Sequence, residues 1–240
     1  MVAAKAPQAG AVKTRLCPPL SAAQAADLAA ALLQDSLRLA AAPGPDADCL
    51  LALHDGGAGG ITTTPSPSFI PVTAEKMRPH AILRQRGDDL GERLVHLFAD
   101  VFAFGYNEVC VIGADAPHLP AAFLLEAFGR LGRKAPGGGG APDVVLGPAD
   151  DGGYYLVALP RPAPEMFEDI PWGGPDVLAM TRARAGASGR TVALLPPWYD
   201  IDTIGDLNRL RGDLRRGLAE APSTGSFLQS LNDDAIHHAY

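Results

Sequence analysis

The sequence contains little cysteine and no long apolar run, and both absences exclude classes of protein. Its three cysteines, Cys17, Cys49 and Cys110, form neither a CxxC pair nor a Cys/His cluster, so a zinc site is not indicated. An odd number of cysteines, two of them in apolar segments, is typical of reduced core thiols in a cytoplasmic protein. Because no stretch approaches about 18–20 apolar residues and no signal peptide opens the chain, we expect a cytoplasmic location and no membrane span.

Lysine and net positive charge are also scarce. The formal net charge of −7 argues against a general nucleic-acid binder, so we expect no nucleic-acid partner. Only four lysines occur in 240 residues, and two of them, Lys5 and Lys13, fall within the first thirteen positions. An acidic protein that concentrates cations in one segment is expected to bind an anion there.

Strand-like and helix-like segments alternate along the chain. Short apolar runs predict strands near residues 1–4, 49–53, 81–83, 109–112, 143–147, 154–159 and 191–195. Helical spacing and capping signals predict helices over 22–42, 90–104, 120–131 and 176–185, and after Thr203. This alternation indicates an α/β fold of three layers (α/β/α) around a mostly parallel, doubly wound sheet. We expect one domain over residues 1–221 and a C-terminal tail over 222–240, with loops at 55–68 and 135–142.

The most informative segment is Val109–Pro117, where an apolar strand is followed by a carboxylate. The apolar run is typical of a central parallel strand covered on both faces, and Pro117 prevents an immediate helix. In open α/β sheets ligands bind beyond the carboxyl ends of the strands, so Asp115 stands where a metal ion or a substrate would be held. The alternative is that Asp115 only caps the turn before Leu119 and Pro120.

The segment Lys5–Arg15 directly follows the first expected strand. Its backbone N–H groups can face an anion, and Gly10 lets the chain turn without steric cost. Lys13 supplies a point charge, and Arg15 supplies a planar fork that suits phosphate oxygens. The spacing matches neither GxxxxGK(S/T) nor GxGxxG, which disfavours a Walker-type NTPase and a dinucleotide-binding enzyme. A basic surface loop is the alternative.

A second carboxylate, Asp202, follows the last expected strand in Trp198–Thr203. Two carboxylates about 4 Å apart repel by roughly 4 kcal/mol at an effective dielectric of about 20, so Asp115 and Asp202 would need a cation or a proton if they meet. With phosphates nearby the simplest cation is Mg²⁺, which accepts a few carboxylates together with substrate oxygens and water. The alternative is that Asp202 and Asp206 only favour the positive end of the final helix.

The segment Leu146–Tyr155 combines adjacent acids with adjacent glycines. Gly152 and Gly153 allow a ligand or another backbone to approach closely. Asp150 and Asp151 could hold sugar hydroxyls or deprotonate an acceptor. A glycine turn with solvated acids is the alternative.

The segment Gln85–Arg93 is similar in kind. Its polar side chains and glycines, with Gln85 and Asp89 among them, come before an expected helix N-terminus, where anions can be bound. The segment around Trp172 is open to two interpretations, as a lid over a site or as an aromatic anchor.

In this order the segments resemble the nucleotide-diphospho-sugar transferase fold. The motifs are KAPQAGAVKTRL (5–16), DLGERL (89–94), GADAP (113–117), GPADDGGYYL (147–156), the segment around Trp172 and DIDT (200–203). The chain is most similar to the glycosyltransferase-like family that is related to 2-phospholactate guanylyltransferases and named for arsenosugar biosynthesis. The resemblance runs from Lys5 to about Thr224 and implies a GT-A-like fold. Six motifs in register make it far more specific than any single one.

The resemblance also implies a role for each candidate residue. Lys13 and Arg15 would hold the nucleotide phosphates and, with Asp151, act in catalysis. Asp115 and Asp202 would be paired ligands of Mg²⁺ or Mn²⁺. The residues that would line the nucleotide and second-substrate sides are Lys5, Gly10, Gln85, Asp89, Asp150, Gly152 and Gly153.

The sequence therefore predicts an Mg²⁺-dependent transferase that uses a nucleotide diphosphate sugar as donor and a small molecule as acceptor. The first alternative is a guanylyltransferase-like nucleotidylyltransferase, in which a phosphorylated acceptor attacks an NTP and pyrophosphate leaves. The alternative of another class is a nucleotide-binding protein without turnover. The oligomeric state stays open, with a homodimer as one alternative.

Overall fold

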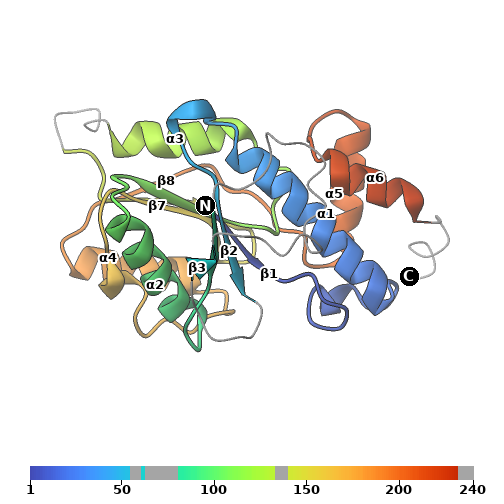
Figure 1. Cartoon of the computed structure of the whole chain (residues 1–240), viewed down its shortest axis with the longest axis horizontal. Coiled ribbons are helices and arrows are strands. Elements are labelled where there is room, and N and C mark those ends of the chain that lie inside the picture. The colour runs from blue at the N-terminus through green and yellow to red at the C-terminus, as the bar shows by residue number, and fades with distance from the viewer. Residues whose placement is uncertain (55–60, 63–80, 133–139, 232–240) are drawn as a thin grey trace.

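Eight strands form one mixed sheet at the centre of the molecule (Figure 1). The computed structural model describes residues 1–54, 61–62, 81–132 and 140–231. In the order of the sheet the strands are β3 (Ile61–Thr62), β4 (Ala81–Arg84), β2 (Leu50–His54), β1 (Val2–Lys5), β5 (Val109–Gly113), β7 (Tyr154–Leu159), β6 (Val144–Pro148) and β8 (Val192–Leu194). The loops expected at 55–68 and 135–142 lie largely outside the described residues, and the short strand β3 falls within the first of them.

Six of the eight strands run in the same direction, so the prediction of a mostly parallel sheet is confirmed. β7 is antiparallel to both β5 and β6, and β3 is antiparallel to β4. β2 and β4 lie on one side of β1, and β5 lies on the other. The strand order therefore reverses between β1 and β5, and ligands of open α/β sheets bind at the carboxyl ends of strands at such a point.

The alternating side chains of β5 fill both faces of the sheet. Val109 and Val111 belong to one apolar cluster, whereas Cys110 and Ile112 belong to the cluster on the opposite face. All four are at most 5% exposed. A strand that is apolar without interruption is stable only where both faces are covered, which is why β5 lies near the middle of the sheet.

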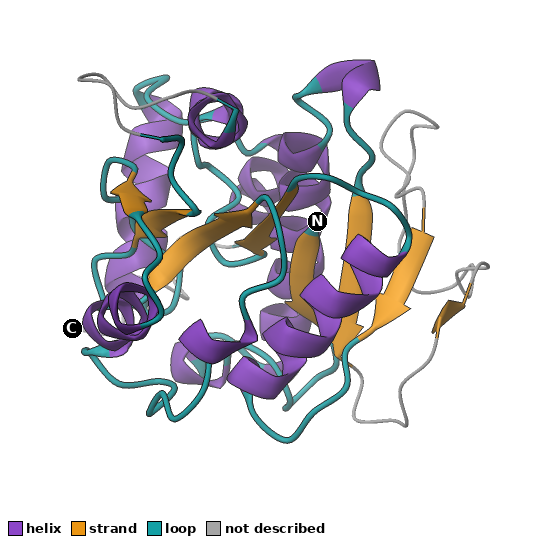
Figure 2. Ribbon diagram, turned by 90° about the vertical axis from the view of Figure 1, so that its left-hand side faces the viewer, coloured by secondary structure: helices purple, strands orange, loops and turns teal. Residues whose placement is uncertain are grey.

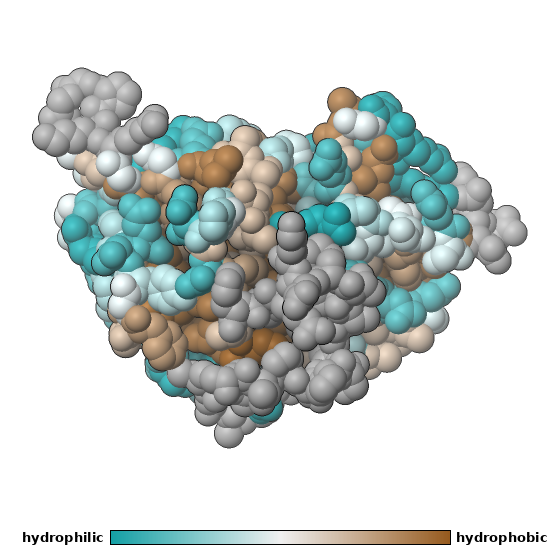
Figure 3. All heavy atoms as spheres, turned by 45° about the horizontal axis from the view of Figure 1, so that its top comes forward, coloured by the Kyte–Doolittle hydropathy of each residue, from teal (hydrophilic) through white to brown (hydrophobic). Residues whose placement is uncertain are grey.

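Helices cover both faces of the sheet, as Figure 2 shows. α1 (Ala22–Ala40) and α3 (Ala121–Leu131) contribute leucines to one apolar cluster, and α2 (Leu90–Ala103) and α4 (Val177–Ala187) pack in the other. Ser21 and Gln24 form the predicted capping box of α1, with their reciprocal side-chain bonds both present. On the face seen in Figure 3, hydrophobic residues form patches between hydrophilic ones. The predicted three-layer α/β/α fold is confirmed.

A third apolar cluster lies beside the sheet, where α5 (Ile204–Arg215) and α6 (Pro222–Ser230) pack with Leu28 and Leu32 in the middle of α1. The structure differs here from the expected tail over 222–240, because residues 222–230 form a packed helix. Asp35 of α1 is 2% exposed, and its carboxylate accepts hydrogen bonds from the backbone N–H groups of Ser223 and Thr224 at 3.0 and 2.8 Å. A carboxylate at a helix N-terminus satisfies donors that have no partner within the helix. α6 is thus attached to α1 through a buried polar contact.

Within the described part of the chain, no helix is long and apolar enough to cross a membrane. Cys49 and Cys110 are buried free thiols, as predicted, and Cys17 is partly exposed.

Candidate active site

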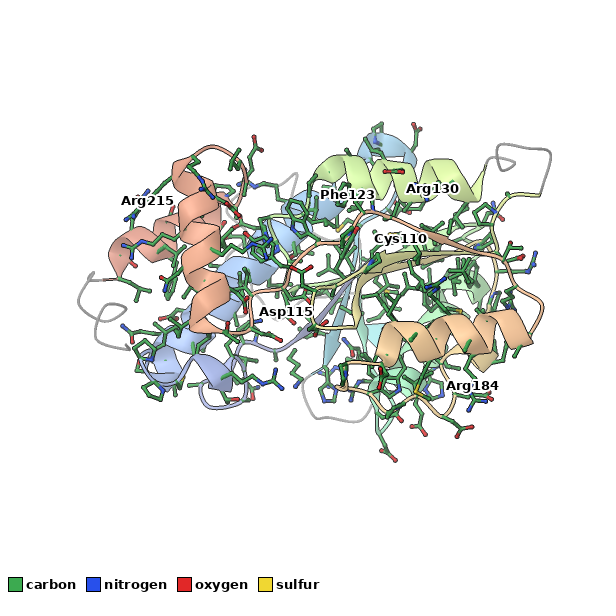
Figure 4. The ribbon with its side chains drawn as sticks, turned by 180° about the vertical axis from the view of Figure 1, so that it is seen from behind. Cys110, Asp115, Phe123, Arg130, Arg184 and Arg215 are labelled. Carbon is green, nitrogen blue, oxygen red and sulfur yellow. The ribbon has the colours of Figure 1, made fainter. Side chains whose placement is uncertain are left out.

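The reversal of strand order between β1 and β5 places two candidate loops side by side. The loop after β1 carries Lys13, and the turn after β5 carries Asp115. Figure 4 shows Asp115 between the sheet and the part of the molecule that α1, α5 and α6 build.

The structure brings Asp115 and Asp202 together. The backbone N–H of Ile201 donates to the backbone carbonyl of Asp115 at 2.8 Å, so the turn after β5 is joined directly to the segment after β8. Both carboxylates contact the same ammonium group: Lys13 Nζ lies 2.5 Å from Asp115 Oδ1 and 3.0 Å from Asp202 Oδ1. The convergence that the sequence predicts is therefore present, and the role of these residues as metal ligands stays a prediction.

Lys13 is the buried centre of this group, with a side chain that is only 7% exposed. It also donates to the backbone carbonyl of Ile201 at 2.6 Å. Burial by itself lowers the pKa of the ammonium, but the charges of Asp115 and Asp202 and their hydrogen bonds outweigh burial, so the pKa is raised. Lys13 is therefore a permanent cation at neutral pH.

The backbone of Lys13 is strained, with a φ of 48° in the left-handed region that non-glycine residues rarely adopt. It precedes the short 3-10 helix η1 (Thr14–Leu16), and the buried side chains of Val12 and Leu16 anchor the loop on both sides of it. This anchoring holds Lys13 in a conformation that directs its side chain inward.

Arg15 differs from Lys13 in exposure. Its side chain is 76% exposed, and Nη1 lies 3.9 Å from Asp202 Oδ2, at the outer limit of an ion pair. Its guanidinium is consequently available to an anion from solvent. Lys5 and Gly10 are also exposed, and Gly10 has the positive φ of 81° that the turn requires.

The loop of residues 149–153 lies against the segment that carries Asp202. The backbone N–H of Asp150 donates to the carbonyl of Trp198 at 2.9 Å. The carboxylate of Asp151 accepts from the N–H of Gly153 at 2.8 Å, and that of Asp150 pairs with Arg209 at 3.1 Å. The loop predicted to face a second substrate therefore borders the same site.

Gly152 is required by this loop for two reasons. It has a φ of +90°, and a Cβ atom at this position would lie 1.9 Å from the carbonyl oxygen of Pro175. The segment before α4 thus packs on the loop at a distance that only glycine permits.

Asp200 is a site residue that the sequence analysis missed. Its carboxyl is largely buried near Asp115, Asp151 and Asp202; burial first, and then these charges, raise its pKa to about 7. One sequence signal could have identified it: Asp200 and Asp202 flank the apolar Ile201, and residues on either side of a buried apolar residue point to the opposite side where the chain is extended. Asp200 and Asp202 therefore face the site together.

Gln85 and Asp89 make contacts other than those expected. The amide nitrogen of Gln85, which is 7% exposed, donates to the backbone carbonyls of Ala52 at 2.8 Å and Ala4 at 3.3 Å. Gln85 thus ties β1 and β2 together. Asp89 caps α2 and accepts from the N–H of Glu92 at 2.9 Å. Their nucleotide contacts stay a prediction.

An aromatic group lies behind Asp115. The ring of His118 is 4.2 Å from that of Tyr199 and 5.5 Å from that of Trp198, measured between ring centroids. His118 is 3% exposed, neither ring nitrogen has a hydrogen-bond partner, and burial lowers its pKa to about 4. Arg209, the partner of Asp150, lies 3.6 Å from the Tyr199 ring centroid. Tyr199 thus contacts both His118 and Arg209.

The carboxylates fit a divalent cation in number and in chemistry. The described residues contain no group of three or more His, Cys, Asp or Glu side chains arranged to hold a metal ion. Mg²⁺ commonly binds one or two protein carboxylates and completes its shell with phosphate oxygens and water. Asp115 and Asp202 are 53% and 41% exposed, and they already share one cation, Lys13.

Comparison with known families and structures agrees with the fold. A family model described as "Uncharacterized protein conserved in bacteria (DUF2064)" matches residues 51–174 of the 240. The chain belongs to this family. The match contains β2, α2, β5, the turn with Asp115 and the 149–153 loop, so the DUF2064 region includes one of the two converging carboxylates.

Two solved structures are similar to this DUF2064 protein over nearly their whole length. A proposed nucleotide-diphospho-sugar transferase from Desulfovibrio desulfuricans G20 has 32% sequence identity and a TM-score of 0.78, covering 98% of this chain and 96% of that chain. CMP:2-keto-3-deoxy-manno-octonic acid synthetase, in complex with CTP, has 12% identity and a TM-score of 0.54, covering 91% of this chain and 99% of that chain, which shows a common fold. No curated protein matches the chain.

Proposed function

We propose that this protein is an Mg²⁺-dependent transferase that uses a nucleotide diphosphate sugar as donor and a small molecule as acceptor. One observation carries the proposal: Asp115 and Asp202, 87 residues apart in the chain, converge on one cation at the switch point of the sheet. The similarity at 32% identity to a proposed nucleotide-diphospho-sugar transferase supports the same reaction class.

The residues around this point have distinct tasks in the proposed reaction. Arg15, exposed at the rim, binds the diphosphate through its planar fork. Asp115 and Asp202 would hold Mg²⁺ or Mn²⁺, and the bound metal would stabilise charge on the departing diphosphate. Asp151, on the loop beside them, would accept a proton from the hydroxyl group of an acceptor.

The nearest alternative is a nucleotidylyltransferase. The fold similarity to a CTP-bound synthetase is consistent with it, and the same cations would stabilise a departing pyrophosphate. The two reactions are therefore distinguished by the product that leaves and not by the residues that hold it.

The experiment begins with ligand identification. Purified protein is screened by thermal shift against UDP-, GDP-, CDP- and ADP-sugars and against NTPs, with and without Mg²⁺; a ligand at 100 times its Kd adds about 2.7 kcal/mol of stability. The ligands that stabilise it are then incubated with candidate acceptors, and the released product is analysed. Nucleoside diphosphate supports the proposal, and pyrophosphate supports the alternative.

Asp115→Ala tests the site itself. The variant is expected to lose turnover and Mg²⁺-dependent ligand binding while its circular dichroism spectrum is unchanged. Asp46→Ala is the matched control. Asp46 is exposed in η2 (Gly44–Asp46), which precedes β2 and so lies at the amino ends of the parallel strands, away from the site. Full activity in Asp115→Ala would remove the metal assignment, and binding without turnover under every metal would favour a non-catalytic protein.

A further inference from the structure

The hydrogen-bonding capacity of Lys13 is fully used within the protein. A lysine ammonium has three N–H donors and no acceptor. Lys13 Nζ has three oxygen partners, at 2.5 Å on Asp115, 3.0 Å on Asp202 and 2.6 Å on the backbone carbonyl of Ile201. In this arrangement Lys13 has no donor left for a nucleotide phosphate.

The same contacts also block a divalent cation. The ammonium touches the Oδ1 atoms of both Asp115 and Asp202, which are the oxygens that converge. A metal ion between these carboxylates would lie within a few ångströms of the ammonium, where like charges repel strongly because the Lys13 side chain is shielded from water. The Lys13 ammonium and a divalent cation therefore compete for one position.

Exposure shows from which side the exchange can occur. The Lys13 side chain is 7% exposed, whereas Asp115 and Asp202 are 53% and 41% exposed. A ligand from solvent consequently reaches the carboxylates before it reaches the ammonium. Arg15, 76% exposed beside Asp202, is positioned to meet an incoming phosphate first.

We infer that Lys13 is a built-in counter-cation that keeps divalent metal out of the nucleotide-free protein, and that metal enters only together with the phosphates that draw the Lys13 ammonium away. This inference rests on the proposed function and adds an order of binding to it. The phosphate oxygens replace the carboxylates as partners of Lys13, and the metal replaces Lys13 as the partner of the carboxylates. In both states each carboxylate has a cation as its partner, which the two carboxylates share.

The test measures metal binding without any turnover. Mn²⁺ is titrated into nucleotide-free protein, and free Mn²⁺ is followed by electron paramagnetic resonance. The variants are Lys13→Met, which removes the ammonium, and Arg15→Met, which changes the net charge by the same amount at an exposed position. Lys13→Gln is a second variant in case Lys13→Met does not fold, and circular dichroism checks each protein.

We expect weak Mn²⁺ binding by the wild type and a gain of at least about tenfold in affinity for Lys13→Met. Arg15→Met should change the affinity by less than about threefold, because its charge is screened by solvent. Asp202→Asn in the Lys13→Met background should remove the gained site. Equal Mn²⁺ affinity in the wild type and Lys13→Met, or an equal gain in Arg15→Met, would overturn the inference.

A second arm uses the wild type alone, so it does not depend on any variant. Mn²⁺ binding is measured with UDP and with GDP, against the same nucleotide without protein. A nucleotide that stabilises the protein should raise the amount of Mn²⁺ bound to it. If such a nucleotide binds and the amount of bound Mn²⁺ does not rise, Lys13 permanently replaces the metal and the proposed exchange is wrong. These outcomes do not depend on which product the enzyme releases, so failure here and failure of the proposed reaction are distinguishable.

Discussion

Two acidic loops border the site, and they are held in different ways. Asp115 and Asp150 have nearly equal exposure, at 53% and 54%, and each pairs with one basic side chain. The partner of Asp115 is Lys13, which is 7% exposed, whereas the partner of Asp150 is Arg209, which is 54% exposed. The two carboxylates are thus matched in exposure, and they differ in the burial of their partner cation.

Different contacts fix the two loops. The Asp115 turn is fixed by a buried cation with every donor satisfied, and by its backbone bond to Ile201. The Asp150 loop has an exposed ion pair, which contributes little to stability. Backbone fit at Gly152 holds that loop instead.

The largest effect should come from Gly152→Ala. The new methyl group would overlap the backbone of Pro175, and alanine would also have to adopt a positive φ, so we expect a loss of about 4 kcal/mol in the free energy of unfolding. Urea denaturation measures this loss. Gly173→Ala is the control, because Gly173 has a similar φ of +85° but no atom lies within 4 Å of the added Cβ. This variant should lose only about 1 kcal/mol. Equal losses would mean that close packing does not fix the loop.

Asp200→Asn should stabilise the protein in alkaline solution. The native pKa of about 7 lies above the value of an unfolded aspartate, so the native state keeps a proton that the unfolded state has lost, and stability falls as pH rises through this window. The variant lacks this penalty and should be more stable than the wild type by about 3 kcal/mol at pH 8. The difference should shrink toward pH 4, as urea titrations at several pH values would show. A constant difference across this range would contradict the assignment.

Asp115→Ala and Asp150→Ala test the comparison directly. Removing Asp115 leaves a buried ammonium with one carboxylate partner, which we expect to cost about 2 kcal/mol of stability after allowance for solvent. Removing Asp150 breaks an exposed pair and should cost less than about 1 kcal/mol. Thermal and urea unfolding of both variants provide the measurement. If the two losses are equal, the burial of the cation is not what distinguishes the loops.

A further, pH-dependent effect concerns His118, three residues after Asp115. Its native pKa of about 4 lies below the value of an unfolded histidine, so the unfolded state binds the proton first and stability falls as pH decreases from about 6.5 toward 4. His118→Phe keeps a ring in contact with Tyr199 and should remove about 1–2 kcal/mol of the stability lost between pH 7 and pH 5. Parallel pH profiles of the two proteins would show that His118 does not titrate in this way.

Local patterns predicted much of the fold. The capping boxes at Ser21 and Thr203 occur as expected, because the residues that form them are close in the sequence. The strand before Asp115 is buried on both faces because its side chains are apolar without interruption. Helix α6 was missed, since much of what holds it comes from Asp35, which is 188 residues away from Ser223.

The candidate site was predicted in part. The carboxyl ends of parallel strands share one edge of the sheet, and this rule was sufficient to expect that Asp115 would meet Asp202. The rule does not give the direction of individual side chains. Gln85 therefore turned out to tie two strands together, and Asp200 to face the carboxylate group.

By itself the sequence determined the order of strands and helices, the chemical groups at the strand ends and the scarcity of cations to balance them, because these depend on residue type and local spacing. Only the tertiary structure decided that one ammonium group satisfies both acids, and that a backbone carbonyl takes its third donor. The physical reason is that hydrogen bonds and burial depend on where distant segments pack, to within an ångström. No local pattern specifies that distance.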